Sequence, residues 1–373
     1  MYLFIFFFYY ITLLYFFKGG GIIFSLFEDN KGKSEGYWNM NNEIIKINSD
    51  VSIRCGASIV GADESEGPLS RYFDICEKDA YFGQETWEKA ESEMVRRTVG
   101  ILLGKAELDI SDVGCALGGD LLNQCVATGY CFSGFDIPYF GLYGACSTAA
   151  EGLVLGSLIC GGGYSDRVIT VASSHFSSSE RQFRYPVEYA GQRTPTSQQT
   201  VTGCGAFLLE RGGGGPYITE AVIGKVVDKG ITDANNMGAA MAPAAADTIL
   251  RYFRESGRDA REFDMIVTGD LAFEGTEILK ELLHFEKFEH FDRIYDCGMM
   301  IFDRSRQDVH SGGSGCGCSA SVVASYILHE LENGADDVLF VGTGAMMSPL
   351  AILQGRSIPS IAHLVHISSG RKR

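Results

Sequence analysis

The strongest constraint on the fold of this chain is that one unit of sequence occurs twice. The first copy has a predicted helix over 87–105, a short polar turn, a buried strand and then Gly119-Asp120-Leu121. The second copy has a predicted helix over 244–255, a similar turn and strand, and then Gly269-Asp270-Leu271. A unit that recurs in the same order indicates a duplicated architecture. Chance similarity between ordinary helix–strand units is the alternative, and the shared Gly-Asp-Leu argues against it.

The repeat continues after each Gly-Asp-Leu. Ala145-Cys146-Ser147 opens a predicted helix that leads to a strand over 167–172. Gly317-Cys318-Ser319 opens another that leads to a strand over 337–341. Strands that alternate with helices predict an α/β fold with helices on both faces of a sheet. We therefore expect two duplicated halves that stack about a pseudo-twofold axis.

Composition limits the possible functions. Of the 373 residues, 46% are hydrophobic and 21% are charged, which is typical of a folded globular protein. The net charge of -16 argues against nucleic acid as a partner, because phosphate binding needs a basic surface. The 11 scattered cysteines predict a reducing compartment and mostly buried thiols. Cys316-Gly317-Cys318 has no second pair of ligands, so we expect no metal site, and nothing indicates a cofactor.

Residues 1–50 differ from the rest of the chain. An apolar run over 1–17 is at the lower length limit for a membrane-spanning helix and lacks the features of a signal peptide. It is a membrane anchor, a sticky tail or the product of a wrongly assigned start codon. Residues 30–50 are polar and linker-like, so we expect the folded body to consist of the halves 51–235 and 236–373.

Cys146 is the most distinctive candidate for chemistry. Strand-like residues 137–142 precede Gly144-Ala145-Cys146-Ser147, and an apolar, helix-compatible run follows. A tight turn between strand and helix places the sulfur at a helix N-terminus, where the dipole and free N–H groups favour a thiolate or a bound anion. The same geometry serves covalent acyl transfer or anion binding, and this turn alone leaves both open.

Three small-residue segments resemble those of the thiolase superfamily, which includes biosynthetic thiolases and ketoacyl synthases. They are the nucleophile turn Gly144-Ala145-Cys146-Ser147-Thr148, the turn Thr202-Gly203-Cys204-Gly205-Ala206 and a C-terminal glycine-rich loop, Gly342-Thr343-Gly344-Ala345. The resemblance implies a thiolase-like αβαβα five-layer fold made of two duplicated halves. It also implies a homodimer, and a glycine-rich loop whose backbone N–H groups help to form an oxyanion hole.

Longer runs resemble the stage V sporulation protein AD family more closely. They are Ser173-Ser174-His175 and residues 182–189, 227–233 and 236–248. The resemblance implies a sporulation protein that binds dipicolinic acid (pyridine-2,6-dicarboxylate) and supports its uptake into the spore across the inner membrane. It also implies a peripheral position on the cytoplasmic face of that membrane and partners among the other proteins of the same sporulation channel complex.

The groups that support a catalytic cysteine in this superfamily are missing at the matching positions. Chain-initiating ketoacyl synthases carry a His in a His-Gln-Ala-Asn-type run, where this chain has residues 240–245 without a titratable side chain. Their Asn-containing turn matches 310–315 here, and His310 is the only candidate base. A thiol without a base acts mainly as a small apolar contact. We therefore predict a non-catalytic binding site; the alternative is an acyl-CoA thiolase or ketoacyl-synthase-type acyltransferase that uses Cys146.

Dipicolinate is a planar dianion that needs donors for two carboxylates, and arginine suits them. A long segment leaves the end of the strand over 167–172, where ligands of α/β sheets gather. Together with the two helix N-termini it supplies the candidate ligand-binding residues Cys146, His175, Arg181, Arg184, Tyr185, Arg193, Thr202 and Cys318. The alternatives are that the arginines pair with Glu180 and Glu188 on the surface and that His175 is structural. For Asp120 and Asp270 we expect a structural role, such as bonding turn N–H groups at the dimer interface or at the interface between the two halves.

Overall fold

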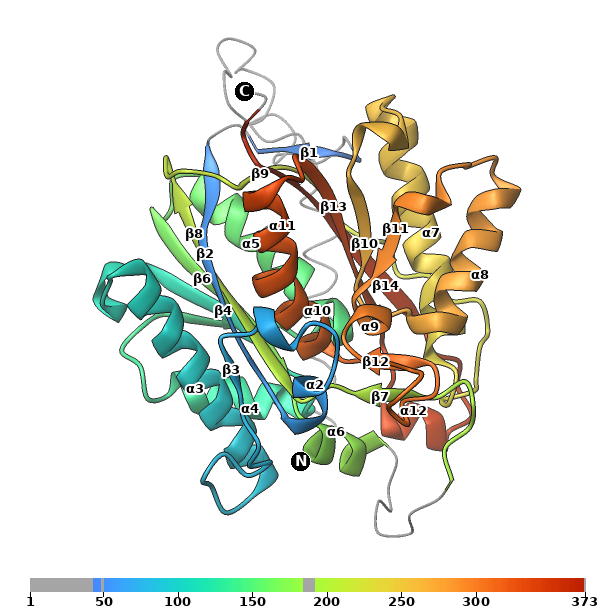
Figure 1. Cartoon of the computed structure of the whole chain (residues 1–373), viewed down its shortest axis with the longest axis horizontal. Coiled ribbons are helices and arrows are strands. Elements are labelled where there is room, and N and C mark those ends of the chain that lie inside the picture. Colours follow the sequence, from blue (N-terminus) through green and yellow to red (C-terminus); the bar gives the residue numbers. More distant parts are fainter. Residues whose placement is uncertain (1–42, 48–49, 184–191, 372–373) are drawn as a thin grey trace, which may run out of the picture. The chain divides into compact units, whose positions relative to one another are not determined.

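A mixed sheet of twelve strands runs through the protein (Figure 1). The computed structural model describes residues 43–47, 50–183 and 192–371. The apolar run over 1–17 lies outside them, so the interpretations of that run stay predictions. Glu43–Arg373 form one compact unit, and the boundary expected between the two halves also stays a prediction.

The order of the strands displays the duplication. The main strands are β2 (Val51–Val60), β4 (Cys115–Gly119), β5 (Tyr139–Gly141), β6 (Arg167–Ser174), β8 (Gly203–Arg211), β9 (Tyr217–Val222), β10 (Met265–Thr268), β11 (Ile294–Asp296), β13 (Asp337–Ala345) and β14 (Ser360–Ser368). One side of the sheet runs β2-β8-β6-β4-β5 and the other runs β9-β14-β13-β10-β11. On each side the first two pairings are antiparallel and the last two are parallel. Ser52 and Tyr217 join β2 to β9 and so join the two sides.

Short strands extend this pattern. β1 (Ile45–Lys46) pairs with β9, and β3 (Ile75–Cys76) pairs with β2. β7 (Gln198–Thr200) and β12 (Gly312–Ser314) form a separate parallel pair. Because β1 belongs to the sheet, the folded body begins before residue 51, earlier than the sequence predicted.

Helices form three layers around and between the two sides of the sheet (Figure 1). α3 and α4 pack on the outer face of one side, α7 and α8 on the outer face of the other, and α5 and α10 lie between the sides. From one face to the other the order is therefore helix, sheet, helix, sheet, helix. The helices are α2 (Ala62–Ser65), α3 (Trp87–Ala106), α4 (Val126–Phe132), α5 (Thr148–Gly161), α6 (Phe176–Phe183), α7 (Met237–Ser256), α8 (Ala272–Phe285), α9 (Cys297–Met300), α10 (Cys316–Val322), α11 (Leu328–Asn333) and α12 (Pro349–Leu353).

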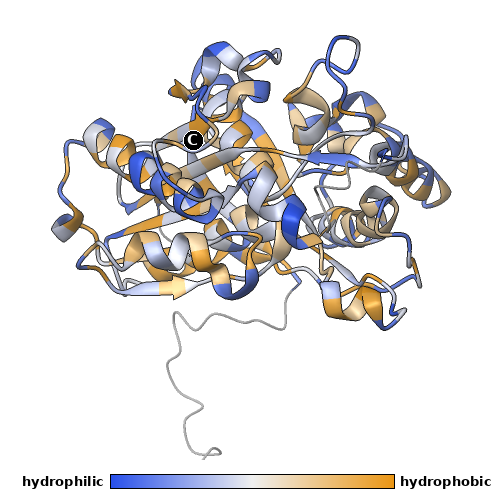
Figure 2. Ribbon diagram, turned by 90° about the horizontal axis from the view of Figure 1, so that it is seen from below, coloured by the Kyte–Doolittle hydropathy of each residue, from blue (hydrophilic) through white to orange (hydrophobic). Residues whose placement is uncertain are grey.

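The sequence of each helix fits its layer. α3 begins where Thr86 Oγ1 accepts a hydrogen bond from the Lys89 N–H, and it buries one apolar stripe that includes Met94 and Leu102. Outer helices like this one alternate between hydrophobic and hydrophilic residues (Figure 2). α5 is rich in Ala, Gly, Leu and Val and is buried on most sides, because both sides of the sheet enclose it.

Two expectations about local structure need correction. Gly342-Thr343-Gly344-Ala345 was expected as a loop but forms the end of β13, because it pairs antiparallel with residues 360–363 of β14. The helix expected over 244–255 starts earlier, at Met237, where the Asn236 side chain caps it. The expectation of mostly buried thiols is confirmed, since every cysteine is free and all except Cys55 and Cys76 are buried.

Buried carboxyl groups predict an unusual pH dependence of stability. Burial raises the pKa of Glu64 and of Glu91 to about 8, and that of Asp296 to about 7. The folded protein therefore keeps protons that the unfolded chain releases above about pH 4 to 5. We expect the free energy of unfolding to be highest near pH 5 and to fall as the pH rises towards 8, by up to ~1.4 kcal/mol per pH unit and group.

The Glu91→Gln variant tests this directly, because Ser173 Oγ and Ser178 Oγ each donate to the Glu91 carboxyl at 2.9 Å and an amide can occupy the same place. Urea midpoints measured at pH 5.5 and pH 8 should lie closer together in this variant than in the wild type. The exposed Glu286→Gln is the control and should keep the wild-type difference. Stability that rises from pH 5.5 to pH 8 would contradict the prediction.

Candidate functional site

The turn that carries Cys146 packs between the two sides of the sheet. Ala145 has a positive φ of 52°, and Ser147 Oγ donates to the Gly144 carbonyl at 2.6 Å. Gly344 at the end of β13 lies so close that a Cβ there would be 2.6 Å from the Gly144 oxygen and 3.0 Å from the Ser147 nitrogen. The shape of the turn is thus set by its own hydrogen bonds and by a glycine contributed from the other copy of the repeat.

Cys146 itself is a buried, neutral thiol. The residue is 5% exposed, and burial raises the pKa of the thiol well above its ordinary value. A hydrogen bond to the Asp270 carboxyl and the charge of that carboxyl raise the pKa further. The expectation that the helix N-terminus favours a thiolate is therefore wrong, because lost hydration and a nearby carboxyl outweigh the helix dipole.

Asp270 lies behind the Cys146 thiol and connects several segments of the site through hydrogen bonds. Its carboxyl accepts hydrogen bonds from Ser314 Oγ at 3.0 Å, from the Gly315 N–H at 2.8 Å and from Thr343 Oγ1 at 2.9 Å. Burial raises the pKa of this carboxyl. Asp270 therefore connects β12, α10 and β13 to the turn that carries Cys146.

Both recurring aspartates accept hydrogen bonds from backbone N–H groups, as expected, but these groups lie in the same half of the chain as the aspartate and not across an interface. In the first copy of the repeat, Asp120 accepts hydrogen bonds from the N–H groups of Leu122 at 2.9 Å and Thr128 at 2.8 Å. In the second copy, Asp270 accepts one from the N–H of Gly315. The addition that the sequence did not predict is the contact of Asp270 with Cys146.

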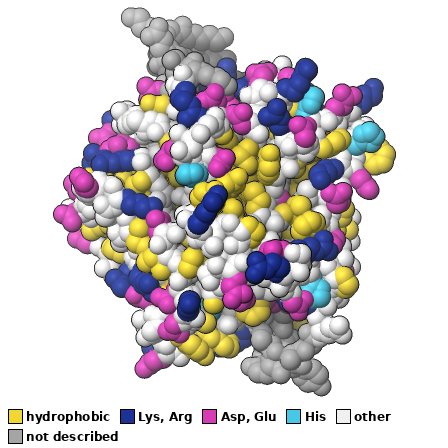
Figure 3. Space-filling view, viewed as in Figure 1, with side chains coloured by type: hydrophobic (Ala, Val, Ile, Leu, Met, Phe, Trp, Pro, Cys, Tyr) yellow, Lys and Arg dark blue, Asp and Glu magenta, His cyan; other side chains and the backbone are white. Residues whose placement is uncertain are grey.

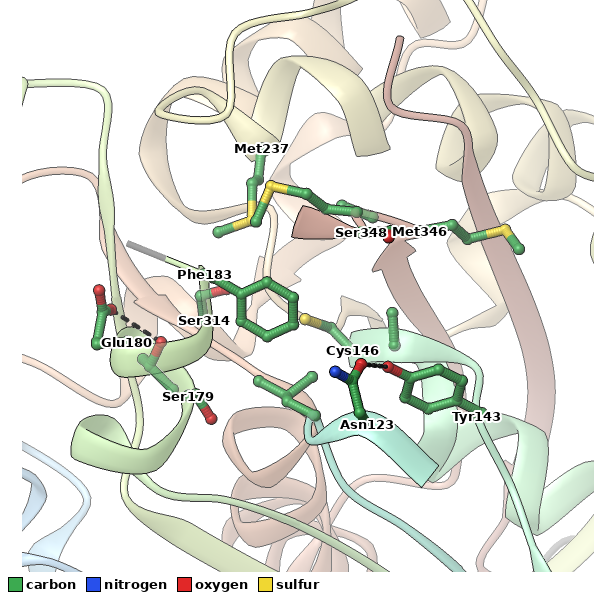
Figure 4. A pocket seen from close by; sticks show the side chains of 15 residues that line it. Asn123, Tyr143, Cys146, Ser179, Glu180, Phe183, Met237, Ser314, Met346 and Ser348 are labelled. Carbon is green, nitrogen blue, oxygen red and sulfur yellow. Dashed lines mark hydrogen bonds between the residues drawn. The ribbon is translucent and has the colours of Figure 1, made fainter. Parts of the chain in front are cut away.

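A cavity of about 280 Å³ lies beside Cys146 (Figure 4). Ser179 and Glu180 stand on one side of the Phe183 ring, and Asn123 and Tyr143 stand on the other. The cavity thus has polar groups on two sides and an aromatic wall between them. It is lined by Leu121, Asn123, Tyr143, Ala145, Cys146, Ser179, Glu180, Phe183, Thr200, Met237, Ser314, Ala345, Met346, Met347 and Ser348.

Of the two segments that were matched to the missing catalytic bases, 240–245 lies outside the cavity, whereas 310–315 contributes Ser314 to its wall. Met241 and Ala242 are buried in the apolar core around α7, and Met237 is the residue of this helix that lines the cavity. His310 Nε2 lies 3.2 Å from Asp308 Oδ1, and His310 does not line the cavity. Among the described residues, the carboxyl that hydrogen-bonds the Cys146 thiol is that of Asp270.

Three of the predicted ligand-binding residues are buried outside the cavity. His175 Nε2 is 2.7 Å from the Ala80 carbonyl oxygen, and burial lowers the pKa of this imidazole. Thr202 Oγ1 accepts a hydrogen bond from the Phe176 N–H at 3.0 Å. Cys318 is a fully buried thiol in α10, and burial raises its pKa well above its ordinary value.

The predicted arginines are placed as follows. Arg181 is paired with Glu88 and lies over the Trp87 ring, outside the cavity. Arg193 donates to Gln199 Oε1 at 3.0 Å and to the Asp308 carbonyl, also outside the cavity. Arg184 and Tyr185 lie outside the described residues. Of the six predicted residues that the structure describes, Cys146 is the one on the wall of the cavity, and the ligand roles of all the others stay predictions.

Most of the cavity wall was missed by sequence reasoning. Ser179 and Phe183 come from α6, Thr200 from β7, and Met346 and Ser348 from the segment after β13. No local motif marks any of them, since the folding of distant segments brings them together. One signal was available: Ser179 and Phe183 are spaced by four residues, as expected of one face of a helix.

Solved structures show the same fold at low sequence identity. OleA of Xanthomonas campestris is 15% identical with a TM-score of 0.53, and the match covers 85% of this chain and 98% of that one. 3-Oxoacyl-(acyl carrier protein) synthase III of Xanthomonas oryzae pv. oryzae KACC10331 is 14% identical with a TM-score of 0.50, covering 85% and 98%. The thiolase-like αβαβα fold made of two duplicated halves, expected from the sequence, is confirmed.

Similarity in sequence gives the family. The family model of stage V sporulation protein AD matches residues 41–368. The stage V sporulation protein AD of Bacillus subtilis (strain 168) is 41% identical over 314 residues, which cover 84% of this chain and 93% of that protein. A match of this extent includes the Cys146 turn, both copies of the repeat and every segment that lines the cavity. The chain therefore belongs to the stage V sporulation protein AD family.

Proposed function

We propose that this protein binds dipicolinic acid in the cavity beside Cys146 and supports the uptake of dipicolinic acid into the spore across the inner membrane. The cavity carries the proposal. Its volume of about 280 Å³ is near the lower end of small-molecule sites, ~300–1,000 Å³. The neutral side chains of Ser179 on one side of Phe183 and of Asn123 on the other can donate to the two carboxylates of a flat ring.

We also propose that the site does not catalyse a reaction. A nucleophilic cysteine needs a thiolate, or a base that takes the proton from the thiol. Burial and Asp270 both hold the proton on Cys146 because they raise its pKa. Asp270 is already the acceptor of three hydrogen bonds besides that of the thiol, which supports a structural role for it.

An acyltransferase that uses Cys146 is the alternative, and the position of the sulfur on the cavity wall favours it. That function requires a covalent acyl group on Cys146. Intact-mass measurement after incubation with an acyl-CoA decides between the two, because an added acyl mass on Cys146 contradicts a purely binding site.

Titration calorimetry with the full chain tests the main proposal. We expect saturable binding of dipicolinate, weakened about tenfold or more in Phe183→Ala because the aromatic wall is lost. Phe285→Ala is the matched control, since Phe285 is 80% exposed and lies on α8 away from the cavity. The absence of any heat of binding at millimolar dipicolinate would rule the proposal out.

We further propose a peripheral position on the cytoplasmic face of the spore's inner membrane, held there by the other proteins of the same sporulation channel complex. Among the described residues, no helix has both the length and the apolar character needed to cross a bilayer. On the face drawn in Figure 3, basic and acidic side chains are interspersed, which supports attachment through proteins rather than direct adhesion to anionic lipid. Loss of the protein from membrane fractions of mutants that lack those partners would support this location.

A homodimer is the last part of the proposal. β5 is an edge strand of the sheet, with the uncharged sequence Tyr139-Phe140-Gly141, and Phe140 is 56% exposed. Edges without charge or proline are suited to pairing with another strand. A second copy of β5, antiparallel to the first, would extend the sheet across a twofold axis. Sedimentation equilibrium that shows a monomer at micromolar concentration would contradict it.

A further inference from the structure

We infer that Ser179 is a ligand-contacting residue whose hydroxyl donates a hydrogen bond to a carboxylate of the bound molecule. The inference rests on the proposed function and assigns one end of the cavity to one carboxylate. Ser179 is fully buried, lines the cavity, and its Oγ has no hydrogen-bond partner among the described residues. Buried hydroxyl groups in proteins almost always have a partner, so an unpaired one on a cavity wall is available to bond a molecule in the cavity.

The neighbours of Ser179 on α6 are already bonded. Ser178 Oγ donates to the Glu91 carboxyl at 2.9 Å, on the side of the helix that faces α3. Glu180 Oε1 accepts from Thr200 Oγ1 at 3.0 Å. The Ser179 N–H donates to the His175 carbonyl at 3.1 Å. These hydrogen bonds hold the backbone of α6 in place on either side of Ser179. The Ser179 hydroxyl therefore stays at the cavity wall without forming a bond of its own.

The position of Ser179 relative to Phe183 fits a carboxylate on a flat ring. The two residues are four apart on α6 and therefore lie on one face of the helix. A ring against Phe183 would direct one substituent towards Ser179 and another towards Asn123 and Tyr143, which stand on the opposite side (Figure 4). The Tyr143 hydroxyl donates to Asn123 Oδ1 at 3.3 Å, which leaves the amide N–H groups of Asn123 to donate to the second carboxylate.

Ser179→Ala tests the inference by binding and by stability. Calorimetry should show dipicolinate bound about tenfold more weakly than by the wild type, as expected for one lost hydrogen bond to a charged group. Pyridine-2-carboxylate, with one carboxylate, should lose much less affinity, because it can place that group at the Asn123 side. Ser177→Ala is the matched control, since Ser177 lies on the same helix and does not line the cavity.

The melting temperature of the free protein gives a second result that does not depend on the ligand. Ser179→Ala should melt at the wild-type temperature or above it, because the variant removes a buried hydroxyl that has no partner. If the wild type does not bind dipicolinate, the proposed function fails and the carboxylate contact of Ser179 fails with it. A clearly lower melting temperature for Ser179→Ala would show that the hydroxyl is already satisfied and would overturn it. Unchanged dipicolinate affinity in Ser179→Ala would overturn it as well.

Discussion

Replacing Gly205 with alanine is expected to lower the free energy of unfolding by about 3 kcal/mol or more. Gly205 lies in β8, where α10 packs directly on the strand. A Cβ at this position would be 2.1 Å from the Ala320 carbonyl oxygen and 2.2 Å from its carbonyl carbon. Both atoms belong to backbone, so a rotation of a side chain cannot relieve the overlap. Urea unfolding followed by circular dichroism measures the change.

Gly100→Ala is the control for this variant. Gly100 is an exposed residue inside α3, and a Cβ there would meet no heavy atom within 4 Å. The same glycine-to-alanine change should therefore stabilise the protein by about 0.5–1 kcal/mol, because alanine favours a helix. Equal stability of Gly205→Ala and the wild type would mean that β8 and α10 are not in backbone contact.

Replacing Asp270 with alanine is expected to cost about 3 kcal/mol of unfolding free energy. The substitution removes the acceptor shared by Ser314 Oγ, the Gly315 N–H and Thr343 Oγ1, and all three donors are buried. Each donor then loses its bond inside the protein and regains no water. Denaturant midpoints compared with the wild type measure the effect.

The surface variant Asp292→Ala is the control for Asp270→Ala. The Asp292 side chain is 76% exposed, and its Oδ2 lies 3.5 Å from Arg293 Nε. Loss of such an exposed ion pair should change the free energy of unfolding by no more than about 0.5 kcal/mol. If the two aspartate variants are equally stable, Asp270 does not hold the segments of the site together.

The duplicated fold was predictable from the sequence because its signals are local. Gly119-Asp120-Leu121 and Gly269-Asp270-Leu271 each lie at the end of a buried strand, and a cysteine turn with a helix follows each in the same order. The second helix begins at Cys316, two residues before the expected Cys318. The end of β13 was not predictable in the same way. Residues 342–345 are mostly small, which predicts a loop, yet they pair antiparallel with β14.

The site was less predictable than the fold, because its wall depends on contacts between distant segments. Cys146 was found since a helix-opening cysteine is visible in one short motif. The helix N-terminus at Cys146 suggested a thiolate. Burial and Asp270 instead keep the thiol protonated, and Asp270 lies 124 positions later in the chain than Cys146. Ser179 and Phe183 became site residues only when α6 was placed against the turn.

The contact between Gly344 and the Cys146 turn has a consequence for how such a site arises. One copy of the repeat provides Cys146 and α6, and the other provides Ser314 and residues 345–348. A protein with one copy of the repeat would form a cavity of this kind only at the interface between two molecules. A symmetric dimer of such a protein would contain two cavities. In this chain the two copies differ: the turn at Cys146 lines a cavity, while Cys318, its counterpart, lies in the packed interior.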